Sequence, residues 1–345
     1  MIGITYHKDY NEYDLGSGHP LVSKKPKKTM EYLEIKGILD QLQIFTPKKA
    51  TKKDLERVHN KKYIEQIKEL SKCGGILSKD TPAPKGIYDI ARLAAGGSIL
   101  CAKKLNEGFK CMCNPLGGFH HANRDTSSGF CFFNDIAIAI EYLRDNYHLK
   151  KFMVIDTDVH HANGTQDIYI EDPSVLNVSF HQDGHTLYPG TGKLEDIGKN
   201  NAKGFNVNFP FPPGTGTGSY LTAFNQIIPT LVKQFKPKII LFQSGVDTHH
   251  SDPLADMELT YQAYFYISNI VKELSENGCN KLLVLFGGGY NINKSVICYY
   301  NLICGLLDNN NYIKEKDILS YSKVEMVLDN ISRLKKLLGE YWDFD

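Results

Sequence analysis

The chain alternates short, uninterrupted apolar runs with longer segments in which apolar residues recur at helical spacing. The runs predict strands at 2–6, 111–114, 151–156, 174–179, 205–208, 238–244 and 281–286. The longer segments predict helices at 30–43, 61–71, 86–105, 132–146, 217–234, 259–276, 292–306 and 323–339. Strands that are apolar on both faces and separated by helices are typical of a mostly parallel sheet covered on both sides. We therefore expect an α/β fold with a sheet of about eight strands.

Composition excludes several classes of protein. The 345 residues include 40 Lys and Arg against 39 Asp and Glu, so the basic excess typical of a nucleic-acid binder is missing and we expect no direct nucleic-acid binding. No apolar stretch reaches the roughly 18 residues of a membrane span. Neither a linker nor an internal repeat interrupts the pattern. We expect a single domain over 1–345 with no membrane partner, and the oligomeric state stays open.

Cysteine usage and the N-terminal segment indicate the compartment. The eight cysteines form no CxxC pair, and most lie in apolar segments. The start at 2–6 is typical of a strand rather than of a signal peptide. We expect free thiols in a reducing cytoplasm, and a eukaryotic source would be compatible with the nucleus as well.

Residues suited to catalysis or metal binding follow four of the predicted strands. These segments are Gly117–His121, Asp156–Asn163, Gly245–Asp247 and Gly287–Tyr290. The carboxyl ends of parallel strands meet at one edge of a sheet, and ligands bind there. We therefore expect the four segments to build one site.

The segment from Val154 to Gly164 indicates half of a metal site. If the strand continues, Asp156, Asp158 and His160 alternate along it and point to one face. A carboxylate and an imidazole two residues apart at a strand end are typical metal ligands, and Asp247 is the best-placed third ligand. The alternative is a buried polar strand end with satisfied hydrogen bonds, in which Asp247 caps a helix.

A histidine pair and a tyrosine complete the set. Metal-bound water requires a base and a departing amine requires a proton, and His120 and His121 can supply both functions. Tyr290 follows three glycines, and its phenol can donate to an oxyanion. The alternatives are a structural histidine pair and a tyrosine packed on the surface. The glycines lack the Walker or GxGxxG spacing of a phosphate-binding loop.

An ordered set of motifs resembles that of the zinc-dependent histone deacetylases of the arginase/deacetylase superfamily. The motifs span about residues 1–306 and comprise Gly16–Pro20, Asp80–Pro82, Gly96-Gly97, Gly117–His121, Ser128–Asp135, Asp156–Asn163, Val178–His181, Tyr188–Gly192, Gly245–Thr248, Asp252–Leu254 and Gly287–Asn291. The resemblance implies the arginase/deacetylase fold. It also implies a hydroxamate-sensitive amidohydrolase that removes acetyl or another short acyl group from lysine side chains of proteins or peptides.

The resemblance implies two kinds of cation site. Asp158, His160 and Asp247 would hold one catalytic zinc ion, and the same ligands also suit ferrous iron. A structural potassium or sodium ion would lie nearby. Its ligands, several of them backbone oxygens, would come from Asp156, Asp158, His160, Ser179 and Phe180.

The resemblance also assigns catalytic roles. His121 would be the general base and the proton donor to the leaving amine, whereas His120 would be an electrostatic partner oriented by Asp156. Tyr290 would polarise the amide carbonyl and stabilise the oxyanion. Asn163 stands where the nuclear members carry an aspartate beside the second histidine. Because a neutral partner raises the pKa of His121 less than a carboxylate does, we expect activity to extend to lower pH.

A tunnel for the lysine stem is implied by five further positions. Phe130 and Tyr188 would flank it, Gly129 and Leu254 would line it, and Asp80 would bind the substrate backbone at the rim. Tyr188 stands where the nuclear members have phenylalanine.

Two more departures concern basic and histidine residues. The run Lys24–Lys28 stands where the family often has an arginine, and it is typical of a solvated loop. The nuclear members also lack the pair His249-His250, for which polar site lining and solvated loop histidines are the alternatives.

Three other functions remain alternatives. An arginase-like binuclear manganese enzyme needs a carboxylate two residues beyond His160, where this chain has Ala162. An inactive acyl-lysine binding module would be expected to lack part of the catalytic set. A deacetylase of small acylated amines, such as acetylpolyamines, is not excluded, because Asp80 and Asp183 are both available to bind a remote amine.

Overall fold

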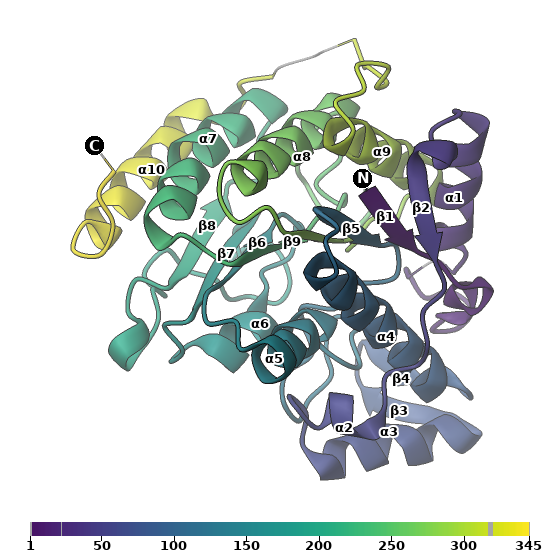
Figure 1. Cartoon of the computed structure of the whole chain (residues 1–345). Helices are drawn as coiled ribbons and strands as arrows, with labels where there is room; N and C mark the ends of the chain where they lie inside the picture. The colour runs from purple at the N-terminus through teal and green to yellow at the C-terminus, as the bar shows by residue number, and fades with distance from the viewer. Residues whose placement is uncertain (1, 22, 317–319, 345) are drawn as a thin grey trace.

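A computed structural model describes residues 2–21, 23–316 and 320–344 (Figure 1). Within them, eight strands form one sheet in the order β2-β1-β5-β10-β9-β6-β7-β8, and every neighbouring pair is parallel. The strands are β1 (Ile2–Thr5), β2 (Leu42–Phe45), β5 (Cys111–Asn114), β6 (Phe152–Asp156), β7 (Val175–Gln182), β8 (Asn206–Phe211), β9 (Ile239–Gln243) and β10 (Leu282–Leu285). A separate antiparallel hairpin pairs β3 (Gly75–Ser78) with β4 (Thr81–Ala83).

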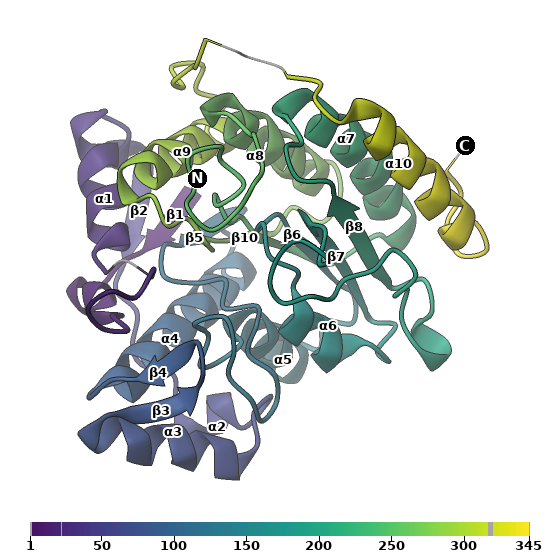
Figure 2. The same cartoon turned by 180° about the vertical axis from the view of Figure 1, so that it is seen from behind.

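Helices cover both faces of the sheet (Figures 1 and 2). One face carries α1 (Lys25–Ile35), α7 (Thr217–Phe235), α8 (Tyr261–Glu276), α9 (Ile292–Leu306) and α10 (Val324–Leu338). The other carries α2 (Lys52–Leu55), α3 (Lys61–Cys73), α4 (Ile87–Asn106), α5 (Asp135–Tyr147) and α6 (Asn163–Tyr169). Short 3-10 turns span Lys8–Glu12, Leu39–Gln41 and Asn200–Ala202. The predicted α/β architecture is confirmed.

The sheet separates two hydrophobic cores. Along β6, Phe152 and Val154 pack into the core beside α4 and α5, whereas Met153 and Ile155 pack into the core beside α7 and α8. Successive side chains of a strand point to opposite faces, so an apolar run is buried on both sides. This double burial explains why the strand predictions succeeded.

The seven predicted strands are present, whereas the strands β2, β3 and β4 and the short helices α2 and α6 were missed. The predicted helix 30–43 was wrong in its limits, because α1 ends at Ile35 and Gly37 turns the chain with a φ of 66°. The following residues form the edge strand β2. The strands β2, β3 and β4 have only three or four residues each and are partly exposed, so they are too short for a periodic pattern to identify them.

The interpretation of Lys24–Lys28 as a solvated loop was wrong. Lys25 begins α1, with Pro26 in its first turn, where a missing N–H costs nothing. The Nζ atom of Lys25 donates to the backbone oxygen of Gly287 at 2.7 Å. This lysine therefore reaches the loop after β10.

The four strands whose ends carry the predicted site residues, β5, β10, β9 and β6, are adjacent in the sheet. Their carboxyl ends therefore place the four following loops next to one another. All eight cysteines are free. In the described parts of the chain, no helix is both long and apolar enough to cross a membrane.

Candidate active site

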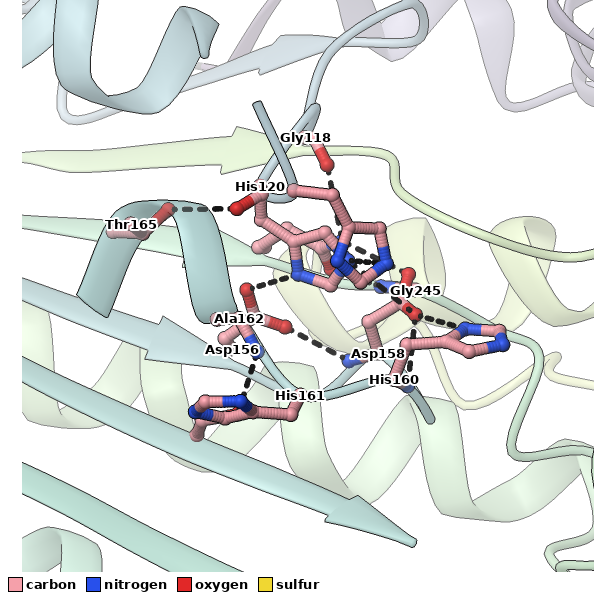
Figure 3. Close-up of polar contacts among 12 residues, drawn as sticks. Gly118, His120, Asp156, Asp158, His160, His161, Ala162, Thr165 and Gly245 are labelled. Carbon is pink, nitrogen blue, oxygen red and sulfur yellow. Dashed lines mark hydrogen bonds and ion pairs between the residues drawn. The ribbon is translucent and has the colours of Figure 1, made fainter. Parts of the chain in front are cut away.

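Three side chains from two loops converge at the carboxyl edge of the sheet, two of them labelled in Figure 3. The Nδ1 atom of His160 lies 3.0 Å from Asp158 Oδ1 and 3.2 Å from Asp247 Oδ2. All three residues are buried. Ligand atoms of a tetrahedral zinc lie about 2.1 Å from the ion, hence about 3.4 Å from one another. The observed separations fit a shared metal ion.

The sequence predicted that Asp156, Asp158 and His160 alternate along one strand, and this prediction was wrong. The three residues are brought together by the fold of a loop instead. β6 ends at Asp156, and Asp158 and His160 lie in the loop beyond it. Asp156 Oδ1 accepts the N–H of Asp158 at 3.1 Å, and Asp158 Oδ1 accepts the N–H of His160 at 3.1 Å. Two consecutive turns closed by aspartate side chains therefore curl the loop.

The other carboxylate oxygens are held by the protein. Asp158 Oδ2 accepts from Gln243 Nε2 at 2.9 Å and from the N–H of Gly288 at 2.7 Å. Asp247 Oδ1 accepts the N–H of Val159 at 2.9 Å. Each carboxylate thus keeps one oxygen directed at His160. The sequence analysis missed Gln243, although a polar residue ending a buried strand was a usable signal.

The electrostatics of this cluster favour a positive charge. Burial and the like charge of Asp158 raise the pKa of Asp247 to about 7. Burial alone would lower the pKa of His160, but its contacts with the two carboxylates raise that pKa to about 10. Two buried carboxylates that face one imidazole therefore suit a dication.

The two predicted catalytic histidines lie against each other and have different partners. His120 Nδ1 lies 2.8 Å from Asp156 Oδ2, and His121 Nδ1 lies 2.6 Å from Asn163 Oδ1. The contact between His120 and Asp156 is drawn as a dashed line in Figure 3. Their Nε2 atoms are 3.1 Å apart, and both side chains are buried. One histidine therefore has an acidic partner and the other a neutral one.

These partners move the two pKa values in opposite directions. Burial lowers the pKa of His120, but Asp156 and Asp158 outweigh burial and raise it above its ordinary value. Burial and the neighbouring imidazoles of His120 and His160 hold the pKa of His121 well below its ordinary value. A pair with separated pKa values can divide the roles of charge holder and base. Of the two, His121 is the imidazole that its surroundings keep neutral.

The five residues expected to form the tunnel line one pocket that opens at the cluster. Its further lining includes His121, His160 and Tyr290, together with Pro20 and Leu187, which the sequence analysis missed. The Phe130 and Tyr290 ring centres lie 5.8 Å apart, and the Tyr188 and His121 ring centres lie 5.3 Å apart. The walls are therefore largely aromatic. They suit an apolar stem.

A strained turn forms one wall of this pocket. Gly129 and Phe130 both adopt positive φ, 53° and 68°, and a Cβ on Gly129 would collide with the His121 ring. Asp80 Oδ2 accepts the N–H of Gly129 at 2.8 Å, and Thr81 Oγ1 accepts that of Phe130 at 3.0 Å. Asp80 thus lies at the pocket as predicted, and it also holds the wall in place.

Tyr290 faces the cluster from the glycine-rich loop. Its ring centre lies 6.3 Å from that of His160, and its N–H donates to Asp252 Oδ2 at 2.7 Å. Burial and the charges of Asp158 and Asp247 raise its pKa, so the phenol stays protonated and can donate. Asp252, which fixes this backbone, received no role from the sequence analysis, although it belongs to one of the motifs.

Other expected residues lie beside the cluster. Ser179 on β7 is the register partner of Asp156, and Phe180 follows it with a fully buried ring. Their role at a monovalent cation stays a prediction. His161 points away from His160 (Figure 3) and contacts Thr191 Oγ1 and Gln166 Oε1 at 2.8 and 3.0 Å.

A second cavity adjoins the cluster. It shares His121, Phe130 and Tyr290 with the pocket and extends to Tyr10, Tyr13 and Lys25. Lys25 therefore contributes an ammonium group to the lining of this second cavity.

Comparisons with known proteins agree with this geometry. Residues 19–306 match the model of the histone deacetylase domain. A probable deacetylase of Archaeoglobus fulgidus is 33% identical and covers 99% of both chains. A histone deacetylase-like amidohydrolase of Pseudomonas aeruginosa is 36% identical over 79% of this chain and 73% of its own. The acetoin utilization protein AcuC of Bacillus subtilis is 32% identical over 84% and 77%, respectively.

A solved structure gives the same result. The crystal structure of the HDA15 HD domain aligns with a TM-score of 0.87 at 25% identity, covering 99% of this chain and 96% of that one. The fold, the converging site residues and the matched domain lead to one conclusion: the chain belongs to the histone deacetylase family.

Proposed function

We propose that this protein is a zinc-dependent deacetylase that removes acetyl or another short acyl group from the ε-amino group of lysine in proteins or peptides. The observation that carries the proposal is the aromatic pocket that ends at Asp158, His160 and Asp247 beside a histidine pair. Two carboxylates and one imidazole leave a tetrahedral ion one position for water or substrate. Ferrous iron fits the same ligands.

Bound by these ligands, zinc would lower the pKa of a water molecule and polarise the amide carbonyl. His121, kept neutral, accepts the proton of the attacking water through Nε2. His120 keeps its proton beside Asp156, and its charge favours the anionic intermediate. His121 then passes its proton to the leaving amine. The Tyr290 hydroxyl donates to the developing oxyanion.

The shape and lining of the pocket support a lysine side chain as the substrate. Phe130, Tyr188 and Leu254 can bury the methylene stem while the carbonyl reaches Tyr290. The hydroxyl of Tyr188 adds a polar contact at the half-exposed mouth, near Asp80. We further propose a structural potassium or sodium ion beside Asp156 and Ser179, whose strands are in register.

The ligand role of Asp247 has a direct test. In Asp247→Ala the metal bound per chain should fall by one and deacetylation should be lost, because a carboxylate ligand is removed. Metal analysis and a peptide deacetylation assay measure both. Asp145→Ala, which removes an exposed carboxylate, is the matched control. An Asp247→Ala protein with unchanged metal content would show that another residue is the ligand.

The Asn163→Asp variant tests the base. A carboxylate 2.6 Å from His121 Nδ1 would favour the charged imidazole and raise the pKa of His121. Since the base must be neutral, the acidic limb of kcat/KM should move to higher pH, by about one unit or more. The pH–rate profile measures this shift. Asn146→Asp, on the exposed face of α5, should leave the limb in place, and an unmoved limb in Asn163→Asp would contradict the role of His121.

Replacing Tyr290 by phenylalanine removes only the hydroxyl. Turnover should fall on the order of 10²–10³-fold, since one oxyanion donor is lost, while bound metal stays constant. Steady-state kinetics and metal analysis separate the two effects, with Tyr147→Phe as the control. Near-normal turnover of Tyr290→Phe would contradict the assignment.

The substrate class is tested with acylated lysine peptides and acetylated polyamines, assayed with and without a hydroxamate chelator. Hydroxamate-sensitive hydrolysis of the peptides, at higher kcat/KM than the polyamines, is the expected result. The reverse order would make the protein a small-amine deacetylase. Binding of acyl-lysine peptides without hydrolysis would reduce it to a recognition module.

A further inference from the structure

A second group of metal-ligating side chains lies outside the site described above. His249 Nε2 is 3.3 Å from Glu315 Oε2, and His250 Nε2 is 3.0 Å from Glu315 Oε1. The two histidines follow β9, whereas Glu315 lies beyond α9. The pair is not among the residues that line the described pocket, so the polar-lining alternative was wrong. The solvated-loop alternative was wrong for His249, which is buried, but His250 is exposed as that alternative required.

The geometry of this group resembles that of the first cluster. One ligand atom from each residue can be chosen so that all three lie within 4.8 Å of one another. The nitrogen–oxygen separations of 3.0 and 3.3 Å are close to the about 3.4 Å expected between neighbouring ligands of a tetrahedral zinc. We propose that His249, His250 and Glu315 form a second site that binds a divalent transition-metal ion of the zinc type.

The ligands are held in place by their surroundings. The His249 ring stacks on Tyr261 with centres 4.6 Å apart. Its Nδ1 accepts the Ser251 N–H at 3.3 Å and lies 2.8 Å from Ser251 Oγ, so contacts at Nδ1 fix the ring while Nε2 faces Glu315. The Tyr261 N–H donates to Glu315 Oε2 at 2.9 Å, and the Glu315 N–H donates to Gln262 Oε1 at 3.1 Å.

Access and chemistry both favour a zinc-type ion. The His250 side chain is 47% exposed, which opens the group to solvent on one side. Two imidazoles and one carboxylate suit zinc, cobalt or nickel, whereas calcium and magnesium need mostly oxygen ligands.

An ion in this second site would stabilise the loop that supports Tyr290. In this loop, Asp252 accepts the Tyr290 N–H at 2.7 Å. The backbone oxygen of Ser251, in the same loop, accepts from Asn291 Nδ2 at 3.2 Å. Joining His249 and His250 to Glu315 ties this loop to the start of α8 and to the segment after α9. The role is structural, and it does not depend on the deacetylase reaction.

The experiment uses the full chain, stripped with a chelator and titrated with Zn²⁺ alone by calorimetry and metal analysis. Two equivalents should bind to the unaltered protein. His250→Ala and Glu315→Gln should each lose one, or bind it at least about tenfold more weakly. Glu315→Gln keeps an acceptor for Tyr261, so its fold is preserved. His185→Ala, at an exposed histidine paired with Asp183, should still bind two.

An Asp247→Ala background separates this site from the catalytic one. That variant should bind one Zn²⁺, and adding His250→Ala should abolish the remaining equivalent. Cobalt gives an independent readout, since its visible absorption reports tetrahedral coordination. Binding of a single equivalent by the unaltered chain, or unchanged binding by both His250→Ala and Glu315→Gln, would overturn the second site. Neither outcome touches the deacetylation assays.

Discussion

Two buried carboxylates placed against each other are the constraint on which the centre of this structure depends. Asp158 and Asp247 have like charges and almost no contact with water, an arrangement that is unfavourable without compensating partners. His160, Gln243 and backbone N–H groups supply those partners. The glycine run after β10 also allows these two carboxylates to be buried. A Cβ on Gly288 would collide with Asp247, so the run serves close approach of the backbone rather than phosphate binding.

The same carboxylate chemistry divides the histidine pair. His120 and His121 are neighbours in sequence, are equally buried and touch through their Nε2 atoms. The partners at Nδ1 differ, because Asp156 at the end of β6 is an acid and Asn163 at the start of α6 is an amide. His120 also lies near Asp158, whereas His121 lies against two imidazoles, so the pKa of His120 is raised and that of His121 is lowered.

The grouping of the four loops could be predicted from the sequence for two reasons. Apolar runs identify the buried strands, and the carboxyl ends of parallel strands lie at one edge of the sheet. Sequence reasoning failed where the structure depends on contacts between distant segments. Gln243 supports Asp158, and Asp252 supports Tyr290, through hydrogen bonds that no local pattern encodes. The contact of Lys25 with the loop after β10 was missed for the same reason, since its partner is a carbonyl far along the chain. Likewise, the edge strand β2 was not predicted, because the sequence of a short half-exposed strand resembles that of a helix end.

In the proposed arrangement, the loop after β9 serves two neighbouring cation sites without forming a binuclear centre. Asp247 points into the first cluster, whereas His249, two residues later, packs on Tyr261 at the start of α8. Position 162, where an arginase-like enzyme would need a carboxylate, is a buried alanine. A second ion therefore has no ligand at position 162. The ligands proposed for a second ion are His249, His250 and Glu315 instead. Because the loop after β9 also fixes the backbone of Tyr290, these ligands can govern how firmly the oxyanion donor is held while taking no part in the chemistry.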